Sequence, residues 1–240
     1  MKKGFTLAEV LITLGIIGVV AALAAPALNS AIQKSKVGPS LRKFVSNLEN
    51  ANELILQDND ADKLTDITNS VESYAQLIKK QLKGGIVTDS SGNPKNYGSI
   101  GPAPKSFDGK KYLSGSQFTH VYSLPDGTDF ALYKYSRPGD VPVNSSYKGR
   151  IFLAMFDING FAQGPNRMGK DMFEFFIDDG GAVVPWGGRQ QAQEDIYWNA
   201  KEKLDWETEC AENKAPAGTI PGEACAGSIA DHGWKVVYKY

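Results

Sequence analysis

The hydrophobic pattern divides the chain into an apolar N-terminal segment and a mixed remainder. Residues 5–28 form an almost uninterrupted apolar run in which the one charged residue is Glu9. As a helix, this run would be about 36 Å long, enough to cross the ~30 Å hydrocarbon core of a bilayer. A carboxylate in such a segment is costly and commonly marks function. We therefore expect a membrane-inserted helix in which Glu9 requires a specific partner.

Helical periodicity continues beyond the apolar run. One face of the following segment carries Leu41, Phe44, Val45, Leu48, Asn52 and Ile55. Only Asn52 is polar among them, and the spacing follows the helical repeat. The pattern predicts one long helix over residues 5–57. Pro26 lacks a backbone donor and predicts a kink, and Gly38-Pro39 predicts a second bend or a break.

The remaining residues predict a head that mixes helix and strand. Residues 58–62 are polar and predict a linker, and residues 70–83 predict a second helix that ends at Gly84-Gly85. A long surface loop is expected over residues 89–116. Alternating or aromatic-rich runs predict strands over 118–124, 129–135, 150–157, 172–177 and 182–184. A further helix over 190–206 and a closing strand over 234–240 complete the prediction. The expected fold is α+β, with a long kinked helix packed on an antiparallel sheet of four or five strands.

The first residues admit three interpretations. Lys2 and Lys3, followed by the apolar run and an alanine-rich site near residues 22–24, are compatible with a secretory signal peptide. The same run is compatible with an unprocessed anchor, with the lysines on the cytoplasmic side and the head outside. The third interpretation rests on residues 3–11, KGFTLAEVL. This segment closely resembles the class III prepilin signal of type IV pilins and type II secretion pseudopilins, and the resemblance covers roughly residues 2–36.

The resemblance implies a processing pathway and an assembly mechanism. A prepilin peptidase would cut after Gly4 and methylate the new N-terminal residue, Phe5, while Glu9 would be the carboxylate for recognition and assembly. Pro26 falls where the family usually has a helix-kinking proline. Methylation keeps the charge of the Phe5 ammonium, so this group would pair with Glu9 of the next subunit, and a paired carboxylate is tolerated in a helix bundle.

The resemblance also implies a division of the chain and a set of partners. Residues 1–4 would be the leader, 5–28 the transmembrane and assembly half of the helix, 29–57 its amphipathic half, and 58–240 the globular head. The expected partners are the prepilin peptidase, other pilin subunits, the inner-membrane assembly platform and membrane lipid. The protein would cross the inner membrane once and then enter an extracytoplasmic filament or the cell surface. A soluble exported binding protein, released by a Sec-type signal peptidase, is the alternative.

The two cysteines, Cys210 and Cys225, lie close together in a loop-rich C-terminal region. In an exported chain, such a pair most simply forms one disulfide. Zinc is disfavoured because His120 and His232 are the only histidines and lack ligand spacing. Type IV pilins commonly close a C-terminal loop in this way, so the pair also agrees with the resemblance.

Residues 156–173 contain the most specific motif outside the leader. They resemble a D-x-N-G…P-N…G-x-D-x-F pattern of pilin-like proteins with this leader. Asp157, Asn159 and Asp171, together with loop carbonyls, are candidate oxygen ligands for calcium. The segment does not follow the EF-hand pattern. The alternative is a structural turn in which Asp157 and Asn159 cap backbone amides and Gly160 adopts positive φ.

Composition argues against two broad classes of function. The formal net charge is −1, with no basic bias, which argues against a nucleic-acid-binding protein. Two isolated histidines and the absence of nucleotide-binding glycine motifs argue against an enzyme. No cofactor is expected other than the candidate calcium ion.

Overall fold

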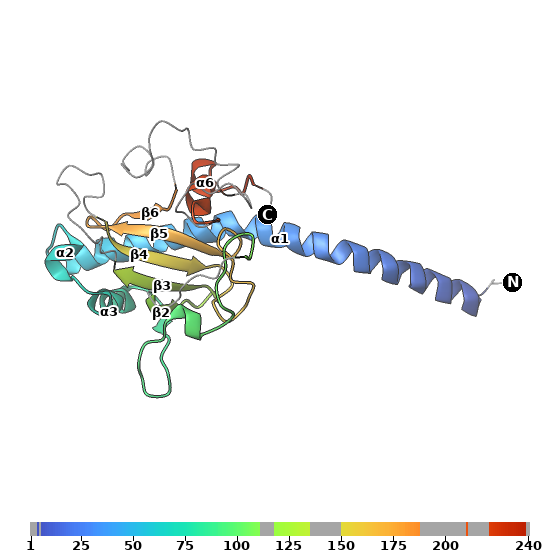
Figure 1. Cartoon of the computed structure of the whole chain (residues 1–240), viewed down its shortest axis with the longest axis horizontal. Coiled ribbons are helices and arrows are strands. Elements are labelled where there is room, and N and C mark those ends of the chain that lie inside the picture. The colour runs from blue at the N-terminus through green and yellow to red at the C-terminus, as the bar shows by residue number, and fades with distance from the viewer. Residues whose placement is uncertain are drawn as a thin grey trace.

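The computed structural model describes residue 4 and residues 6–110, 118–134, 150–187, 210 and 221–238. A long N-terminal helix runs along one face of an antiparallel sheet, and its first half projects from the head (Figure 1). The α+β class and the packing of the helix on the sheet are therefore as the sequence predicts. The helix expected over residues 190–206 lies outside the described residues.

The N-terminal helix, α1, extends over Leu7–Asp58 and is 52 residues long. It continues through Pro26 and also through Gly38-Pro39. The prediction of a break at Gly38-Pro39 is therefore wrong. Val37 and Leu41 are both fully buried there, and this packing holds the helix where Pro39 would weaken it. Position 38 also requires a glycine, because a Cβ there would overlap the carbonyl oxygen of Trp234. The kink at Pro26 stays a prediction.

The second half of α1 buries the predicted apolar stripe against the sheet. Leu41, Phe44, Leu48 and Ile55 are at most 2% exposed. Phe44 stacks on Phe156 with ring centroids 4.2 Å apart, which places the aromatic centre of the core between helix and sheet.

Two short helices connect α1 to the sheet. α2 covers Leu64–Ile67 and falls just after the expected linker, where Leu64 is fully buried. α3 covers Val71–Gln81, and the Ser70 hydroxyl caps it by accepting from the backbone N–H of Ser73 at 3.1 Å. The helix predicted over 70–83 is therefore confirmed. A 3₁₀ turn, η1 at Tyr97–Ser99, lies in the long loop that follows.

The sheet is an antiparallel meander with strand order β1-β2-β3-β4-β5-β6. The strands are Gly85–Ile86, Thr119–Ser123, Asp129–Lys134, Arg150–Asp157, Met172–Asp178 and Val183–Pro185. The sequence predicts all but β1, which has only two residues. Strand β5 is buried on both faces, since Phe173 and Phe175 pack toward α1 while Met172 and Phe176 join a second apolar cluster. This explains its run of aromatic residues.

The C-terminal region differs most from the prediction. Residues Cys225–Asp231 form a helix, α6, which packs on α1, β5 and β6. Residues 234–238 form no strand, so the closing strand expected from their alternation is wrong. This tail instead packs against α1, where Lys34 donates to the carbonyl oxygen of Tyr238 at 3.2 Å. The Tyr238 hydroxyl donates to the carbonyl oxygen of Gly169 at 2.6 Å, and this contact fixes the tail at the base of the head.

Candidate functional site

The chain around the predicted processing bond precedes the helix. Gly4 is exposed and outside any regular element, Thr6 is the N-cap, and α1 begins at Leu7. The Gly4–Phe5 peptide bond therefore lies before the first turn of α1. Phe5 itself lies outside the described residues.

Glu9 has a partner within its own helix. Its Oε2 accepts hydrogen bonds from the backbone N–H and from the hydroxyl of Thr6, each at 2.8 Å. The backbone N–H of Glu9 donates in return to the Thr6 hydroxyl at 3.2 Å. This reciprocal arrangement is a capping box, and its T-x-x-E signature was visible in the sequence. The Glu9 carboxylate thus has hydrogen-bond partners within its own chain.

The first half of α1 is apolar on all sides and uncovered. Its large apolar side chains from Leu7 to Leu28 are 42–80% exposed. Among the described residues, α1 is the helix long and apolar enough to cross a membrane, and its most apolar window is 0% buried in the structure. A helix that is apolar all round is buried in lipid or protein. This half of α1 therefore requires a bilayer or other helices as its surroundings.

The second candidate site is the loop between β4 and β5, where Asp157 is fully buried. Its Oδ1 accepts from the backbone N–H of Asn159 at 2.9 Å, whereas its Oδ2 has no hydrogen-bond partner. Asp157 also lies directly opposite Asp129 in the β3–β4 ladder. Burial, followed by the nearby charges of Asp171 and Asp129, raises the pKa of Asp157 to about 8.

Asp171 and Asn166 hold the far end of this loop. The Asp171 carboxylate accepts from the backbone N–H groups of Asn166, at 2.9 Å, and of Arg167. The Asn166 side-chain amide donates to the carbonyl oxygens of Pro102 and Phe161 at 2.8 and 2.9 Å. Burial raises the pKa of Asp171 despite these hydrogen bonds. Sequence reasoning missed the role of Asn166, although the P-N pair in the motif indicated a turn there.

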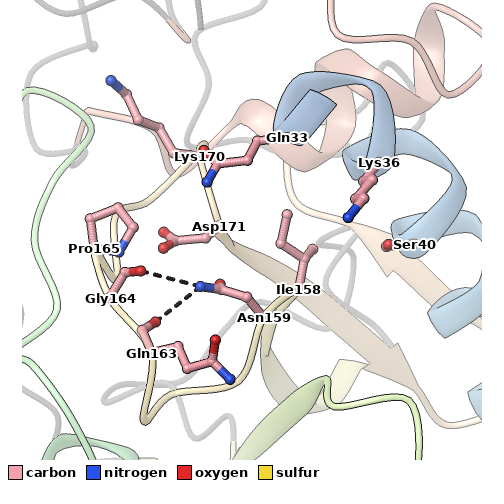
Figure 2. A pocket seen from close by; sticks show the side chains of 10 residues that line it. All are labelled: Gln33, Lys36, Ser40, Ile158, Asn159, Gln163, Gly164, Pro165, Lys170 and Asp171. Carbon is pink, nitrogen blue, oxygen red and sulfur yellow. Dashed lines mark hydrogen bonds between the residues drawn. The ribbon is translucent and has the colours of Figure 1, made fainter. Parts of the chain in front are cut away.

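Asn159 and Asp171 line a cavity of about 360 Å³ between the loop and α1 (Figure 2). The Asn159 amide donates to the carbonyl oxygens of Gln163 and Gly164 at 3.1 and 3.2 Å. Gly160 adopts φ 83°, which the structural-turn interpretation expects. Within the described part of the chain, no three His, Cys, Asp or Glu side chains are placed to hold a metal. A cation in this loop would therefore need amide and carbonyl oxygens as well as carboxylates.

A disulfide joins Cys210 to Cys225, with Cα atoms 5.1 Å apart. Both residues are buried, and Cys225 begins α6. Gly169 of the β4–β5 loop lies directly against Cys225, because a Cβ on Gly169 would overlap the Cys225 sulfur. The disulfide thus supports the same loop that carries Asp157 and Asp171.

Comparison with known proteins identifies the N-terminal segment. Residues 1–25 match a family model described as the prokaryotic N-terminal methylation motif. No curated protein and no solved structure gives a significant match. The matched residues contain the predicted processing bond, the Thr6–Glu9 capping box and most of the exposed apolar helix. The chain therefore carries the N-terminal signal of type IV pilin-like and pseudopilin precursors.

Proposed function

We propose that this protein is a structural subunit, a pilin or minor pilin, of a type IV pilus or a type II secretion-like filament. Prepilin peptidase would cut after Gly4 and methylate Phe5, and the N-terminal helices would then pack together. Before assembly, α1 would anchor the subunit in the inner membrane. The inner-membrane assembly platform would then transfer the subunit to an extracytoplasmic filament or the cell surface.

The observation that carries this proposal is the uncovered apolar half of α1, which projects from the head (Figure 1). The head buries the other half of the same helix, so cleavage near residues 22–24 would leave only a truncated α1 on the head. Cleavage after Gly4 would keep the whole helix as an assembly element. The methylation motif, the exposed apolar half of α1 and the start of this helix at Leu7 all favour cleavage after Gly4.

The capping box would hold the Glu9 carboxylate in place for pairing with the Phe5 ammonium of a neighbouring chain. In the isolated subunit, Glu9 accepts two hydrogen bonds from Thr6. In a filament, the ammonium of a neighbouring Phe5 would add an opposite charge to a carboxylate already held in place. Opposite charges attract strongly where water is excluded, so this pair would favour one register of helix packing.

The first test is intact-mass and N-terminal peptide analysis of protein from membrane and sheared-surface fractions. A chain that begins at Phe5 with one extra methyl group is the expected result. A chain that begins near residues 25–27 would mean a soluble exported binding protein, and the filament proposal would be wrong.

The second test separates the charge of Glu9 from its capping role. Glu9→Gln retains a capping-box acceptor but removes the charge, whereas Glu9→Ala removes both. We expect both variants to fold and insert but to enter fibres poorly, while Glu53→Ala, an exposed change in the same helix, serves as the matched control. Normal incorporation of Glu9→Gln would contradict the pairing model and leave capping as the role of Glu9.

A further inference from the structure

The part of α1 that follows its apolar half carries positive charges alone. Residues 29–48 contain four basic residues and no acidic residue, whereas residues 49–66 contain six acidic residues and one lysine. Lys36 and Arg42 of the basic stretch are exposed, and among the described residues neither forms an ion pair. Positive charge is therefore concentrated where α1 enters the head, next to the segment long and apolar enough to cross a membrane.

The C-terminal tail brings further interfacial side chains to the same end of the head. Residues 234–238 lie beside α1 where the helix leaves the head (Figure 1). Lys235 is exposed and forms no ion pair within the described part of the chain, Trp234 is partly buried, and Val237 is 40% exposed. Tryptophan is enriched at membrane–water interfaces, and lysine keeps its charge in the polar layer while its stem covers apolar surface. The tail thus has the composition of a surface that meets lipid headgroups.

Two hollows lie against different faces of α1 at this level. Ser35, Trp234 and Lys235 border a groove of about 600 Å³. Gln33 and Lys36 border the cavity beside the β4–β5 loop (Figure 2). Each hollow combines a cation with hydroxyl or amide groups, and ammonium groups form strong charge-assisted hydrogen bonds to phosphate. Both hollows therefore suit a phosphate group with a polar substituent.

The acidic groups near these hollows are already engaged. Asp171 lines the cavity, but its carboxylate accepts from the backbone N–H groups of Asn166 and Arg167. Lys43 borders the groove and pairs with Asp126 at 2.6 Å. The exposed cations at this end of the head are therefore not neutralised by either carboxylate.

The position along α1 also fits the polar layer of a bilayer. Lys34 and Lys36 follow Leu28, the end of the apolar run, by six and eight residues, which corresponds to about 9 and 12 Å along the helix. The headgroup layer on each side of the hydrocarbon core is about 5–8 Å thick. Helical Cα–Cβ bonds tilt toward the N-terminus, which here is the direction of the membrane. The long lysine side chains can therefore reach back to the lipid phosphates.

We propose that Lys34, Lys36, Trp234 and Lys235 form a basal surface that binds the anionic headgroups of membrane phospholipids such as phosphatidylglycerol. A lipid is the favoured occupant because α1 itself would hold this surface at the level of the headgroups. The alternative occupant is the acidic end of a second copy, around residues 49–66. The inference rests on the proposed insertion of α1 in a membrane and not on filament assembly.

Thermal unfolding of the full chain in uncharged dodecyl maltoside micelles tests this surface. We expect added phosphatidylglycerol to raise the melting temperature, by about 5–10 °C at a hundredfold excess over its dissociation constant. Phosphatidylcholine, which has no net charge, should have little effect, and about 0.5 M salt should weaken the shift by screening exposed charges. Equal shifts with the two lipids would overturn the proposal. An equal shift with free glycerol 3-phosphate would indicate a site for a soluble anion and would also overturn it.

A pair of charge variants locates the binding surface. Lys36→Gln/Lys235→Gln removes two exposed cations from the basal surface, and each lysine near an anionic lipid surface contributes about fivefold to binding. The phosphatidylglycerol concentration at the midpoint of the shift should therefore rise roughly 25-fold. Lys79→Gln/Lys80→Gln removes the same charge from α3, at the other end of the head (Figure 1), and should leave the midpoint unchanged.

The two proposals fail in different ways. An unchanged midpoint in Lys36→Gln/Lys235→Gln would overturn the lipid-binding surface, and poor entry of that variant into fibres would then identify a second copy as the occupant. Neither result bears on cleavage after Gly4, which N-terminal mass analysis decides separately.

Discussion

Asn52 is the polar member of the apolar stripe on α1, and its removal tests how the head is fastened to that helix. Its Oδ1 accepts from the Tyr74 hydroxyl of α3 at 2.6 Å, and its amide nitrogen donates to the carbonyl oxygen of Gly181 at 2.8 Å. The side chain is fully buried. Asn52 therefore links α1 to α3 and to the turn between β5 and β6.

The expected loss of stability follows from these two hydrogen bonds. Each buried hydrogen bond contributes about 1 kcal/mol, and each group left unpaired costs about 1–3 kcal/mol. Asn52→Ala removes both bonds and leaves the Tyr74 hydroxyl and the Gly181 carbonyl oxygen without this partner. We expect a loss of about 3–4 kcal/mol in the free energy of unfolding. Tyr74→Phe removes one bond, retains the stacking on Phe152, and should cost about 1–2 kcal/mol.

Urea unfolding of the full chain in micelles, followed by near-ultraviolet circular dichroism, measures these changes. In the Asn52→Ala background, Tyr74→Phe should be nearly neutral because it removes a hydroxyl that has already lost its partner. The double-mutant cycle should therefore give a coupling of about 1–2 kcal/mol. Asn50→Ala, an exposed change in the same helix, should stay within about 0.5 kcal/mol of the parent. A coupling near zero would refute the hydrogen-bond argument.

Three further predictions concern the tail, the disulfide and a buried histidine. Gly38→Ala should destabilise the head in urea unfolding, because its Cβ would overlap the Trp234 carbonyl oxygen; stabilisation by about 1 kcal/mol, the normal gain in helix propensity, would show that the tail moves freely. Reduction of Cys210–Cys225, which closes a short loop, should lower stability by about 3 kcal/mol, and an unchanged urea midpoint in dithiothreitol would contradict this. Burial lowers the pKa of His120, an effect that the nearby Glu72 charge opposes. The unfolded chain then binds the proton more readily, so stability should decline as pH falls below about 6.5 toward the folded-state pKa. His120→Gln should remove that part of the decline between about pH 7 and 5.

Local signals in the sequence are sufficient to predict much of the structure of the head. The Ser70 hydroxyl caps α3 where the sequence predicts a helix start, and Gly160 adopts the positive φ expected of the D-x-N-G turn. Both are short-range effects, in which a residue acts on a backbone group within a few positions. The Thr6–Glu9 capping box is equally local, but an expected intermolecular role for Glu9 obscured it.

The predicted secondary structure is wrong where contacts with segments distant in the sequence determine the conformation. Alternation in residues 234–240 predicts a strand, yet residues 234–238 lie against α1, where Tyr238 contacts Lys34 and Gly169. Helix α1 survives Pro39 because Val37 and Leu41 are buried on the head. Strand β1, at Gly85–Ile86, is too short for any periodicity and exists because β2 pairs with it. In each case the segment that packs against or pairs with the mispredicted one lies far away in the sequence, so no local pattern identifies it.

The two candidate sites share one physical feature, which is an environment that the described part of the chain does not complete. The first half of α1 exposes apolar surface that water does not favour, and the β4–β5 loop buries oxygen atoms without donors. Asn52 and Tyr74, by contrast, are buried and paired with each other. Departures from such pairing are expected at functional positions. The apolar half of α1 therefore requires lipid or other helices around it, and the unpartnered oxygen atoms mark the β4–β5 loop as a candidate site.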